Sequence, residues 1–83
     1  MRLVFHGKFA DIAGSGELTL VRPPEVATLK ELRTWLTLSL PALSDALKGR
    51  GAATIINLAV VHDPQHPVKD SDEVVFLPPM SGG

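Results

Sequence analysis

The residues best suited to chemistry stand at the carboxyl end of the chain, in the stretch "FLPPMSGG" (residues 76–83). Two prolines there lack an N–H group and fix φ, so they end a strand's hydrogen-bond ladder and project the following residues away from it. The two final glycines have no Cβ, so the narrow channel of another protein can admit them. A carboxylate presented on such a segment can be activated, for instance by adenylation, with no side chain obstructing the attack. The candidate reactive group is the carboxylate of Gly83, and the candidate inserting residues are Pro78, Pro79, Met80, Ser81 and Gly82. The alternative is a frayed end that happens to contain glycine.

The other residues that could do chemistry do not form a convergent set. His62 and His66 lie four positions apart, but Pro64 separates them in a segment typical of a loop, so they share no helix face for a zinc ion. His6 is more typical of a surface or interface residue on a strand than of a base. The "AGSG" stretch lacks the lysine of a phosphate loop, and "KDSD" has neither the length nor the glycine position of a calcium loop. We therefore expect no metal, no cofactor and no catalysis by the chain alone.

The composition limits the class of protein. The chain has 83 residues, 45% of them hydrophobic and 20% charged, with a formal net charge of −1. These values predict one globular domain with a small core, and the lack of a basic run argues against a nucleic-acid or anionic-membrane partner. The chain has no cysteine, which excludes disulfides, thiolate catalysis and zinc–thiolate sites and is compatible with a reducing compartment. The apolar start is too short for a signal peptide, so we expect a soluble, cytoplasmic protein.

The first part of the chain predicts two strands, over residues 2–10 and 17–21. The first stretch is rich in strand-forming residues, and the second alternates polar and apolar residues until Pro23 and Pro24. Gly14 and Gly16 lie between them, so we expect an antiparallel pair joined by a short loop.

The middle of the chain predicts a main helix that begins after Thr28. Thr28 and Glu31 form a capping box, in which the hydroxyl accepts from a free helix N–H and the carboxylate reaches back. Leucines recur at helical spacing from residue 29 to residue 40 and give one apolar stripe. Pro41 ends this helix and opens a short second one, which Gly49 and Gly51 end.

The last part of the chain predicts two more strands. Residues 52–62 form a β-branched run about one strand long, residues 63–72 are typical of a loop, and residues 73–77 form the last strand. The order ββαββ predicts an α+β fold, in which one main helix covers one side of a mixed sheet. We place the folded domain at residues 1–77 and a flexible tail at residues 78–83.

The helix can cover only one face of such a sheet, so the other face must be open. If Leu3 and Phe5 point inward, Val4 and His6 point outward, because side chains alternate between faces. The same alternation turns Val75 and Leu77 outward if their neighbours are buried. An exposed apolar patch on a small protein indicates a partner surface, although single surface valines are common. The predicted partner interface comprises Val4, His6, Val60, Val75 and Leu77.

The stretch "HPVKDSDEVVFLPPMSGG" (residues 66–83) resembles the end of the small subunit of molybdopterin synthase, a ubiquitin-like β-grasp sulfur carrier of the MoaD/ThiS family. In that family an acidic turn leads into an aromatic strand, two prolines and a final Gly-Gly. The stretches "RLVFHGKFADIAG" and "VATLKELRTWL" are similar to the family's first strand and helix opening, and Asn57 matches an asparagine that ends its third strand. Ser71 stands where the family has a glycine, so this turn must accept an unfavourable φ or take another shape.

The resemblance implies a specific chemistry for the tail. An E1-like enzyme that uses ATP would adenylate the Gly83 carboxylate, and sulfur transfer would convert it to a thiocarboxylate. The tail would then enter the large catalytic subunit of molybdopterin synthase and donate sulfur to a pyranopterin precursor of the molybdenum cofactor. His6 and Leu77 occupy positions where the family has partner-facing aromatic residues.

Three alternatives remain at the level of the sequence. The same carrier chemistry could serve thiamine or cysteine synthesis. The chain could be a β-grasp interaction module that carries no sulfur, or a ubiquitin-like modifier that forms isopeptide bonds.

Overall fold

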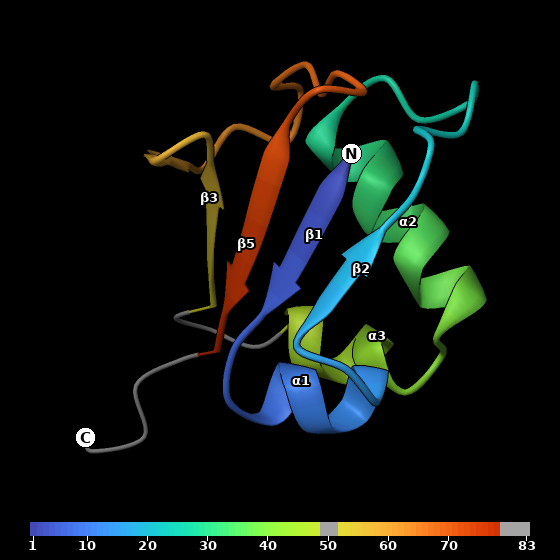
Figure 1. The fold of residues 1–83 in the computed structure, drawn as a ribbon, viewed down its shortest axis with the longest axis vertical. Helices are drawn as coiled ribbons and strands as arrows, with labels where there is room; N and C mark the ends of the chain where they lie inside the picture. The colour runs from blue at the N-terminus through green and yellow to red at the C-terminus, as the bar shows by residue number, and fades with distance from the viewer. Residues whose placement is uncertain (49–51, 79–83) are drawn as a thin grey trace.

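Five strands form one mixed sheet in the computed structural model, which describes residues 1–48 and 52–78 (Figure 1). The strands are β1 (Arg2–Phe5), β2 (Glu17–Thr19), β3 (Ala53–Ile56), β4 (Ala59–Val61) and β5 (Glu73–Leu77). Their order across the sheet is β2-β1-β5-β3-β4. The central pair β1 and β5 is parallel, and all other neighbours are antiparallel. The predicted α+β class and mixed sheet are confirmed, whereas the order ββαββ is wrong in two places.

The first error is the strand predicted over residues 2–10, which ends at Phe5. Gly7 has a positive φ of 56° and turns the chain into helix α1 (Lys8–Ala13). This helix ends at Gly14, which adopts the left-handed conformation that glycine tolerates at a helix end. Phe9 on α1 is fully buried. The burial of its side chain stabilises the helix and outweighs the strand propensity of this segment. The connection between β1 and β2 is therefore a helix rather than a short loop.

The second strand is also shorter than predicted, because its partner strand ends. β2 stops at Thr19, whereas the alternation of residues extends to position 21. Arg2 pairs with Thr19, and two further hydrogen bonds join Met1 and Leu20: the Leu20 amide donates to the Met1 carbonyl, and the Met1 α-amino group donates to the Leu20 carbonyl. Arg2 is the first residue of β1 that pairs with β2.

The main helix begins at the predicted cap. Helix α2 (Leu29–Ser39) starts after Thr28, whose hydroxyl accepts a hydrogen bond from the Glu31 amide at 3.3 Å. The Glu31 carboxylate accepts from the Ala27 amide at 3.0 Å, which completes the capping box. The short second helix also forms, as α3 (Leu43–Lys48). The glycines proposed to end it, Gly49 and Gly51, lie outside the described residues.

The second error is the single strand predicted over residues 52–62, which is a hairpin. Asn57 and Leu58 have positive φ values of 49° and 72° and form a two-residue turn between β3 and β4. Such turns match the twist of the paired strands, and asparagine tolerates the left-handed conformation. Leu58 stands where glycine usually completes this pattern, which concealed the turn in the sequence.

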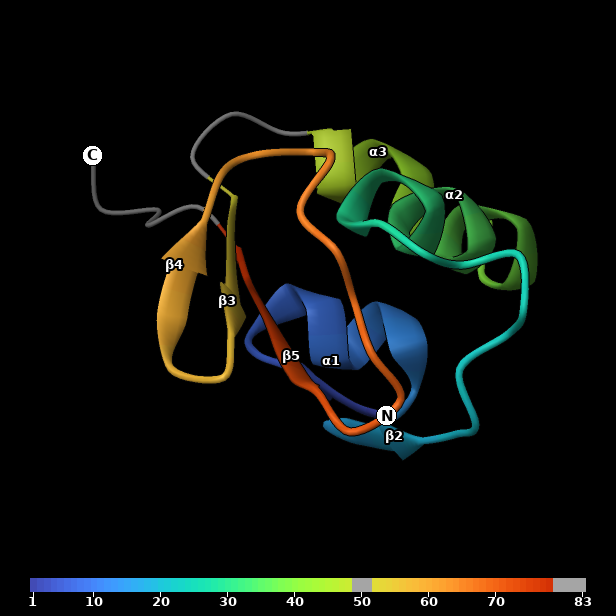
Figure 2. The ribbon, with the colours of Figure 1, turned by 90° about the horizontal axis from the view of Figure 1, so that it is seen from above.

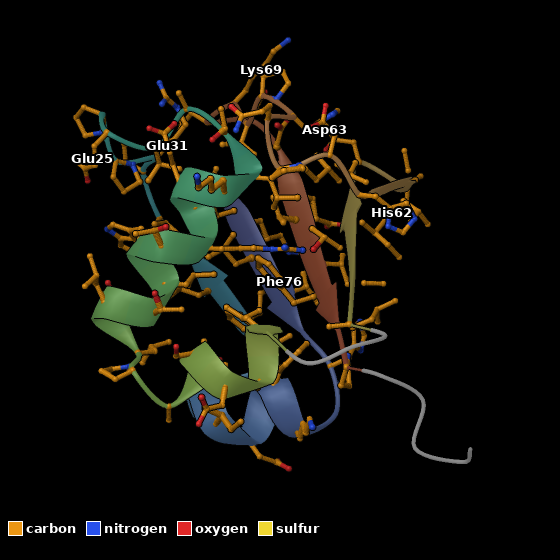
Figure 3. The ribbon with its side chains drawn as sticks, turned by 180° about the vertical axis from the view of Figure 1, so that it is seen from behind. Glu25, Glu31, His62, Asp63, Lys69 and Phe76 are labelled. Atoms are coloured by element: carbon orange, nitrogen blue, oxygen red, sulfur yellow. The ribbon has the colours of Figure 1, made fainter. Side chains whose placement is uncertain are left out.

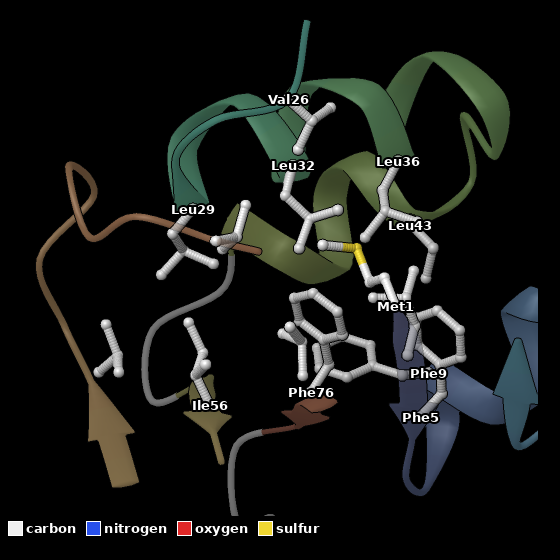
Figure 4. Packing of buried hydrophobic residues seen from close by; sticks show 14 residues of the cluster. Met1, Phe5, Phe9, Val26, Leu29, Leu32, Leu36, Leu43, Ile56 and Phe76 are labelled. Atoms are coloured by element: carbon white, nitrogen blue, oxygen red, sulfur yellow. The ribbon is translucent and has the colours of Figure 1, made fainter. Parts of the chain in front are cut away.

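The core lies between the sheet and the two helices on one of its sides. Figure 2 shows α2 and α3 on that side, and Figure 4 shows side chains of α2 directed toward the sheet. Leu32 and Leu36 of α2 are fully buried, and the rings of Phe5 and Phe76 stack with their centroids 5.6 Å apart. The leucine stripe predicted for α2 therefore packs against the inward residues of β1 and β5.

Candidate functional site

Strand β5 leads the chain toward its carboxyl end from the centre of the sheet. Val74 and Phe76 are buried under the helices, whereas Val75 and Leu77 are only partly buried. Leu3 and Phe5 of the parallel neighbour β1 are likewise buried, so the predicted alternation of faces in both strands is confirmed. Pro78, which follows β5, therefore lies at the lower edge of the middle of the sheet (Figure 1).

One row of apolar side chains crosses the open face of the sheet. The ladder registers place Val4 beside Val75, Val75 beside Ile55, and Ile55 beside Val60. Val60 is 59% exposed, and Val4, Ile55 and Val75 are partly buried. Four neighbouring strands thus present a continuous apolar row, which we call the valine row: Val4, Val75, Ile55 and Val60. Ile55 was missed in the sequence because a single strand over residues 52–62 places Ile55 and Val60 on opposite faces, whereas the hairpin pairs them on one face.

Charged side chains border the valine row on the side away from the tail. Arg2 lies between Glu17 and Glu73, with nitrogen–oxygen distances of 2.7 and 2.8 Å. The hydrogen bond that Arg2 donates to the Glu17 carboxylate, and the negative charge of that carboxylate, raise the pKa of Arg2. Exposed ion pairs of this kind contribute little to stability. Their effect is to give the apolar row a polar rim, as protein interfaces commonly have.

Histidines border the row on the side of the tail. Leu77 pairs with Ala53, and the His6 amide donates to the Phe76 carbonyl at 3.2 Å. Continuing the registers by one residue brings His6 beside Leu77 and His62 beside Ala53 on the open face. His6 and His62 are both exposed, so the two imidazoles flank Leu77 at opposite ends of this row. His62, which the sequence analysis considered only as a metal ligand, therefore belongs to the same face as His6.

The start of the tail packs closely against the turn after β1. A Cβ atom built on Gly7 would lie 3.0 Å from Cγ of Pro78, and Gly7 has a φ of 56° that other residues rarely adopt. Glycine at position 7 therefore lets the Pro78 ring approach the backbone. The remaining candidate tail residues, Pro79, Met80, Ser81, Gly82 and Gly83, lie outside the described residues.

A polar clamp holds the hairpin turn against the loop that precedes β5. Asp72 is buried, and its carboxylate accepts hydrogen bonds from the Asn57 side chain and from the Lys69 amide, both at 2.8 Å. The side-chain oxygen Oδ1 of Asn57 in turn accepts from the Glu73 amide at 3.0 Å. Ser71 is not among the residues with positive φ, so the turn takes a different shape from the one that glycine would allow. Asp72, which the sequence predicts only as part of a loop, is thus a buried structural group.

The described residues also bear on other kinds of site. Within residues 1–48 and 52–78, no three His, Cys, Asp or Glu side chains gather in a way that could hold a metal ion. In the same part of the chain, no helix is both long and apolar enough to cross a membrane. The arrangement that the structure does build is an open apolar row, a polar rim and a terminal segment that starts beside it.

Comparisons with known proteins agree with this geometry. The sequence profile of the ThiS family matches residues 3–83. Small archaeal modifier protein 1 from Haloferax volcanii superposes with a TM-score of 0.85 at 22% identity, over 100% of this chain and 98% of the other. Small archaeal modifier protein 1 from Methanosarcina acetivorans gives 0.79 at 26% identity, over 99% and 94%. No curated protein sequence matches the chain.

A third solved structure carries a different description. The putative molybdopterin converting factor, subunit 1, from Pyrococcus furiosus superposes with a TM-score of 0.78 at 19% identity, over 95% of both chains. Identities this low establish a common fold alone. The fold of the chain is accordingly the ubiquitin-like β-grasp, as the resemblance implied.

Proposed function

Because the chain belongs to the ThiS family, we propose that it is a sulfur carrier and the small subunit of a molybdopterin synthase. It is not a catalyst on its own in this proposal. The reactive group is the carboxylate of Gly83, and the two partners are an E1-like activating enzyme and the large catalytic subunit. Since the activation consumes ATP, we place the reaction in the cytoplasm.

The proposed chemistry takes place on the last carbonyl carbon. An oxygen of the Gly83 carboxylate attacks the α-phosphorus of ATP on the activating enzyme, which releases pyrophosphate and leaves an acyl adenylate. Hydrosulfide supplied by a separate donor then attacks the acyl carbon, loses its proton, and displaces AMP. The resulting thiocarboxylate transfers its sulfur to the pyranopterin precursor on the large subunit, and water restores the carboxylate. The chain needs no cysteine for this sequence, since the sulfur is carried by the main-chain terminus.

One observation carries the proposal: β5 contributes Val75 to the apolar row on the open face, and the sequence continues from β5 to the final Gly-Gly. Val75 and Leu77 of β5 face outward on the open side of the sheet, and the Pro78 ring fixes the start of the tail against Gly7. A partner that binds the valine row is thereby in position to receive residues 79–83. The five residues extend on the order of 17 Å when fully stretched, which is enough to enter a deep channel.

Docking and reaction are separate tasks in this arrangement. The tail is short and glycine-ended, so it supplies little apolar surface of its own. The apolar row buries against the partner and provides the affinity, with the Arg2 ion pairs at its rim. The proposed interface residues Val4, His6, Val60, Val75 and Leu77 all lie on this face, and Ile55 joins them.

Mass spectrometry after activation tests the proposal. The protein is incubated with ATP, the activating enzyme of its own host and a sulfur donor. The intact mass is expected to rise by the difference between one sulfur and one oxygen atom. A variant that lacks Gly83 should show the same fold by circular dichroism and no gain in mass. Sulfur uptake by the truncated form would place the carrier site elsewhere and overturn the proposal.

A second candidate function is a protein modifier, and the two small archaeal modifier proteins favour it. In that case the activated Gly83 carbonyl is attacked by a lysine amine of a target protein rather than by sulfur. The two functions separate in a lysate of the host to which ATP is added. A modifier gives lysine-linked conjugates, whose target lysines carry residues 70–83 after tryptic digestion because Lys69 is the last basic residue of the chain. A dedicated sulfur carrier gives a thiocarboxylate without such conjugates.

A further inference from the structure

The side of the molecule away from the valine row carries a pocket with two cationic side chains. It has a volume of about 470 Å³ and lies between α2 and α3. Lys30 and Arg33 of α2 line it together with Thr34, Thr37 and Ser44. The other described lining residues are Leu47, Ala52 and Pro64, so the pocket has an apolar wall and no acidic one.

Helix geometry brings the polar groups of the pocket together. Residues three and four positions apart share a face of a helix, so Lys30, Arg33 and Thr37 form one stripe of α2 beside its buried leucines. Ser44 and Leu47, three positions apart on α3, face the same space. Helix α2 thus forms one wall of the pocket, and helix α3 forms another.

The guanidinium of Arg33 lacks a counter-ion. Its Nη2 donates to the Thr54 hydroxyl at 2.9 Å, which is a neutral acceptor. Its Nε is buried and has no hydrogen-bond partner among the residues that the structure describes. In that part of the chain the recorded ion pairs involve only Met1 and Arg2 as cations, so neither Arg33 nor Lys30 is neutralised. A partly buried cation without a counter-ion raises the free energy of the folded state.

The nearby carboxylates do not fill this role. Glu31 is one position from Lys30, but its carboxylate is bound to the Ala27 amide and the Thr28 hydroxyl at the start of α2. Asp63 precedes Pro64 of the pocket, but its carboxylate accepts from the Gln65 amide within its own loop (Figure 3). Among the described residues it forms no ion pair with Lys30 or Arg33. An anion from solution is therefore the group that this pocket lacks.

We propose that this pocket binds a small phosphate monoester. A phosphate dianion matches the two positive charges of Lys30 and Arg33, and the Arg33 guanidinium has further N–H donors besides the one that Thr54 accepts. Ser44 adds a hydroxyl donor, and Leu47, Ala52 and Pro64 offer an apolar surface to the organic part of the ester. A volume of about 470 Å³ is larger than inorganic phosphate requires and is within the size range of small-molecule sites. The site is independent of the proposed sulfur chemistry, because it lies on the helical side of the sheet.

Titration with phenyl phosphate, followed by ¹⁵N–¹H correlation spectra of the intact chain, tests this site. We expect saturable shifts confined to amides of the pocket residues on α2 and α3 and near residue 52. Lys30→Gln and Arg33→Gln should each weaken binding about tenfold, which corresponds to the loss of one charge-assisted hydrogen bond. Lys69→Gln removes an exposed lysine from the loop before β5 and serves as the matched control, for which no change is expected.

Two further ligands identify the part of the phosphate ester that the pocket recognises. Benzoate keeps the ring but carries one charge, and inorganic phosphate keeps the charge but has no ring, so both should bind more weakly than phenyl phosphate. Equal binding of benzoate would overturn the assignment to a dianion, and equal binding of inorganic phosphate would overturn the role of the apolar wall. The absence of saturation with phenyl phosphate, or an equal loss in Lys69→Gln, would overturn the site itself. The spectra also report whether Arg33→Gln is folded, and Lys30, which is exposed, can be replaced without loss of packing.

Discussion

At the scale of single residues, Leu58 has a backbone conformation that suits glycine. Its φ of 72° lies in the left-handed region, and its side chain is 92% exposed at the tip of the β3–β4 hairpin. A non-glycine residue loses about 1 kcal/mol or more in this region, and an exposed side chain recovers nothing from packing. Leu58 therefore costs stability, while it adds an exposed apolar group two positions from Val60 on the open face of the sheet.

Replacing Leu58 by glycine should stabilise the protein. We expect Leu58→Gly to raise the free energy of unfolding by about 0.5 kcal/mol, because relief of the left-handed strain exceeds the added chain entropy of glycine. Urea unfolding measures this change. Val21→Gly is the control, since Val21 is 81% exposed and has no positive φ, and it should lower stability instead. A loss of stability in Leu58→Gly would show that the leucine side chain contributes packing in the hairpin.

Asp70 makes the stability of the chain depend on pH. The Arg22 amide donates to its carboxylate at 2.7 Å, and the α-amino group of Met1 lies 3.5 Å away. These contacts, the hydrogen bond from Arg22 first, lower the pKa of Asp70 below its ordinary value of 3.8. A group whose pKa is lower in the folded state stabilises the fold above its unfolded pKa, and this contribution disappears as the pH falls through the folded pKa.

The comparison of the wild-type chain with Asp70→Asn isolates that contribution. Near neutral pH the wild type should be the more stable of the two in urea unfolding. The difference should be constant down to the ordinary aspartate pKa and should shrink below it, because the protonated carboxyl group resembles the amide. Glu25→Gln, an exposed carboxylate, is the control and should change little at any pH. A difference that grows toward acid would contradict the assigned direction of the pKa shift.

At the scale of elements, the turn between β1 and α1 contacts the residue that follows β5. Gly7 and Gly14 bracket α1, and both have positive φ, but only Gly7 has a neighbour at the place where a Cβ would stand. The parallel pairing of β1 with β5 brings Pro78 over this turn. The base of the proposed tail is thus fixed by two segments about seventy residues apart in the chain.

Alanine substitutions separate backbone strain from steric contact at this junction. Gly14→Ala should cost about 1 kcal/mol from its φ alone, since nothing lies within 4 Å of the new Cβ. Gly7→Ala should cost about 2 kcal/mol, because the Cβ would also meet the Pro78 ring at 3.0 Å. The double variant Gly7→Ala/Pro78→Ala should recover the steric part, as measured by urea unfolding. Equal costs at positions 7 and 14, with no recovery, would show that the proline ring does not constrain the turn.

At the scale of the whole molecule, the sheet divides the chain into a covered face and an open face. Leu32 lies in the covered layer and is fully buried, whereas Leu77 lies in the open layer and is partly buried. Burial of a charge without a partner costs several kcal/mol, but a charge that reaches water costs little. The two faces should therefore respond differently to the same substitution.

We expect Leu32→Asp to unfold the domain and Leu77→Asp to leave it folded. In addition, Leu77→Asp should weaken binding to the activating enzyme or the large subunit, because a charge would enter the proposed apolar interface. Circular dichroism and isothermal titration calorimetry measure the two effects. Loss of fold in both variants would mean that the open face contributes to the core, and unchanged binding by folded Leu77→Asp would remove Leu77 from the interface.

Much of the architecture could be predicted from short-range patterns. The capping box at Thr28, the leucine stripe of α2 and the alternation in β1 and β5 are local signals, and each corresponds to an observed feature. The errors concern segments whose conformation depends on distant contacts. Residues 8–13 became a helix because Phe9 enters the core, and residues 52–62 became a hairpin because two residues accept positive φ. Strand propensity alone predicts neither the helix nor the hairpin.

The sequence by itself determined the apolar row on β1 and β5, the proline spacer and the glycine end, because these follow from residue types and from the two-residue period of a strand. Only the tertiary structure decided that β1 pairs with β5, that Ile55 completes the row, and that Lys30 and Arg33 share a pocket with α3. The physical reason is the same in each case. Local conformation is set by neighbouring residues, whereas register and helix packing are set by burial of side chains that the chain brings together only on folding.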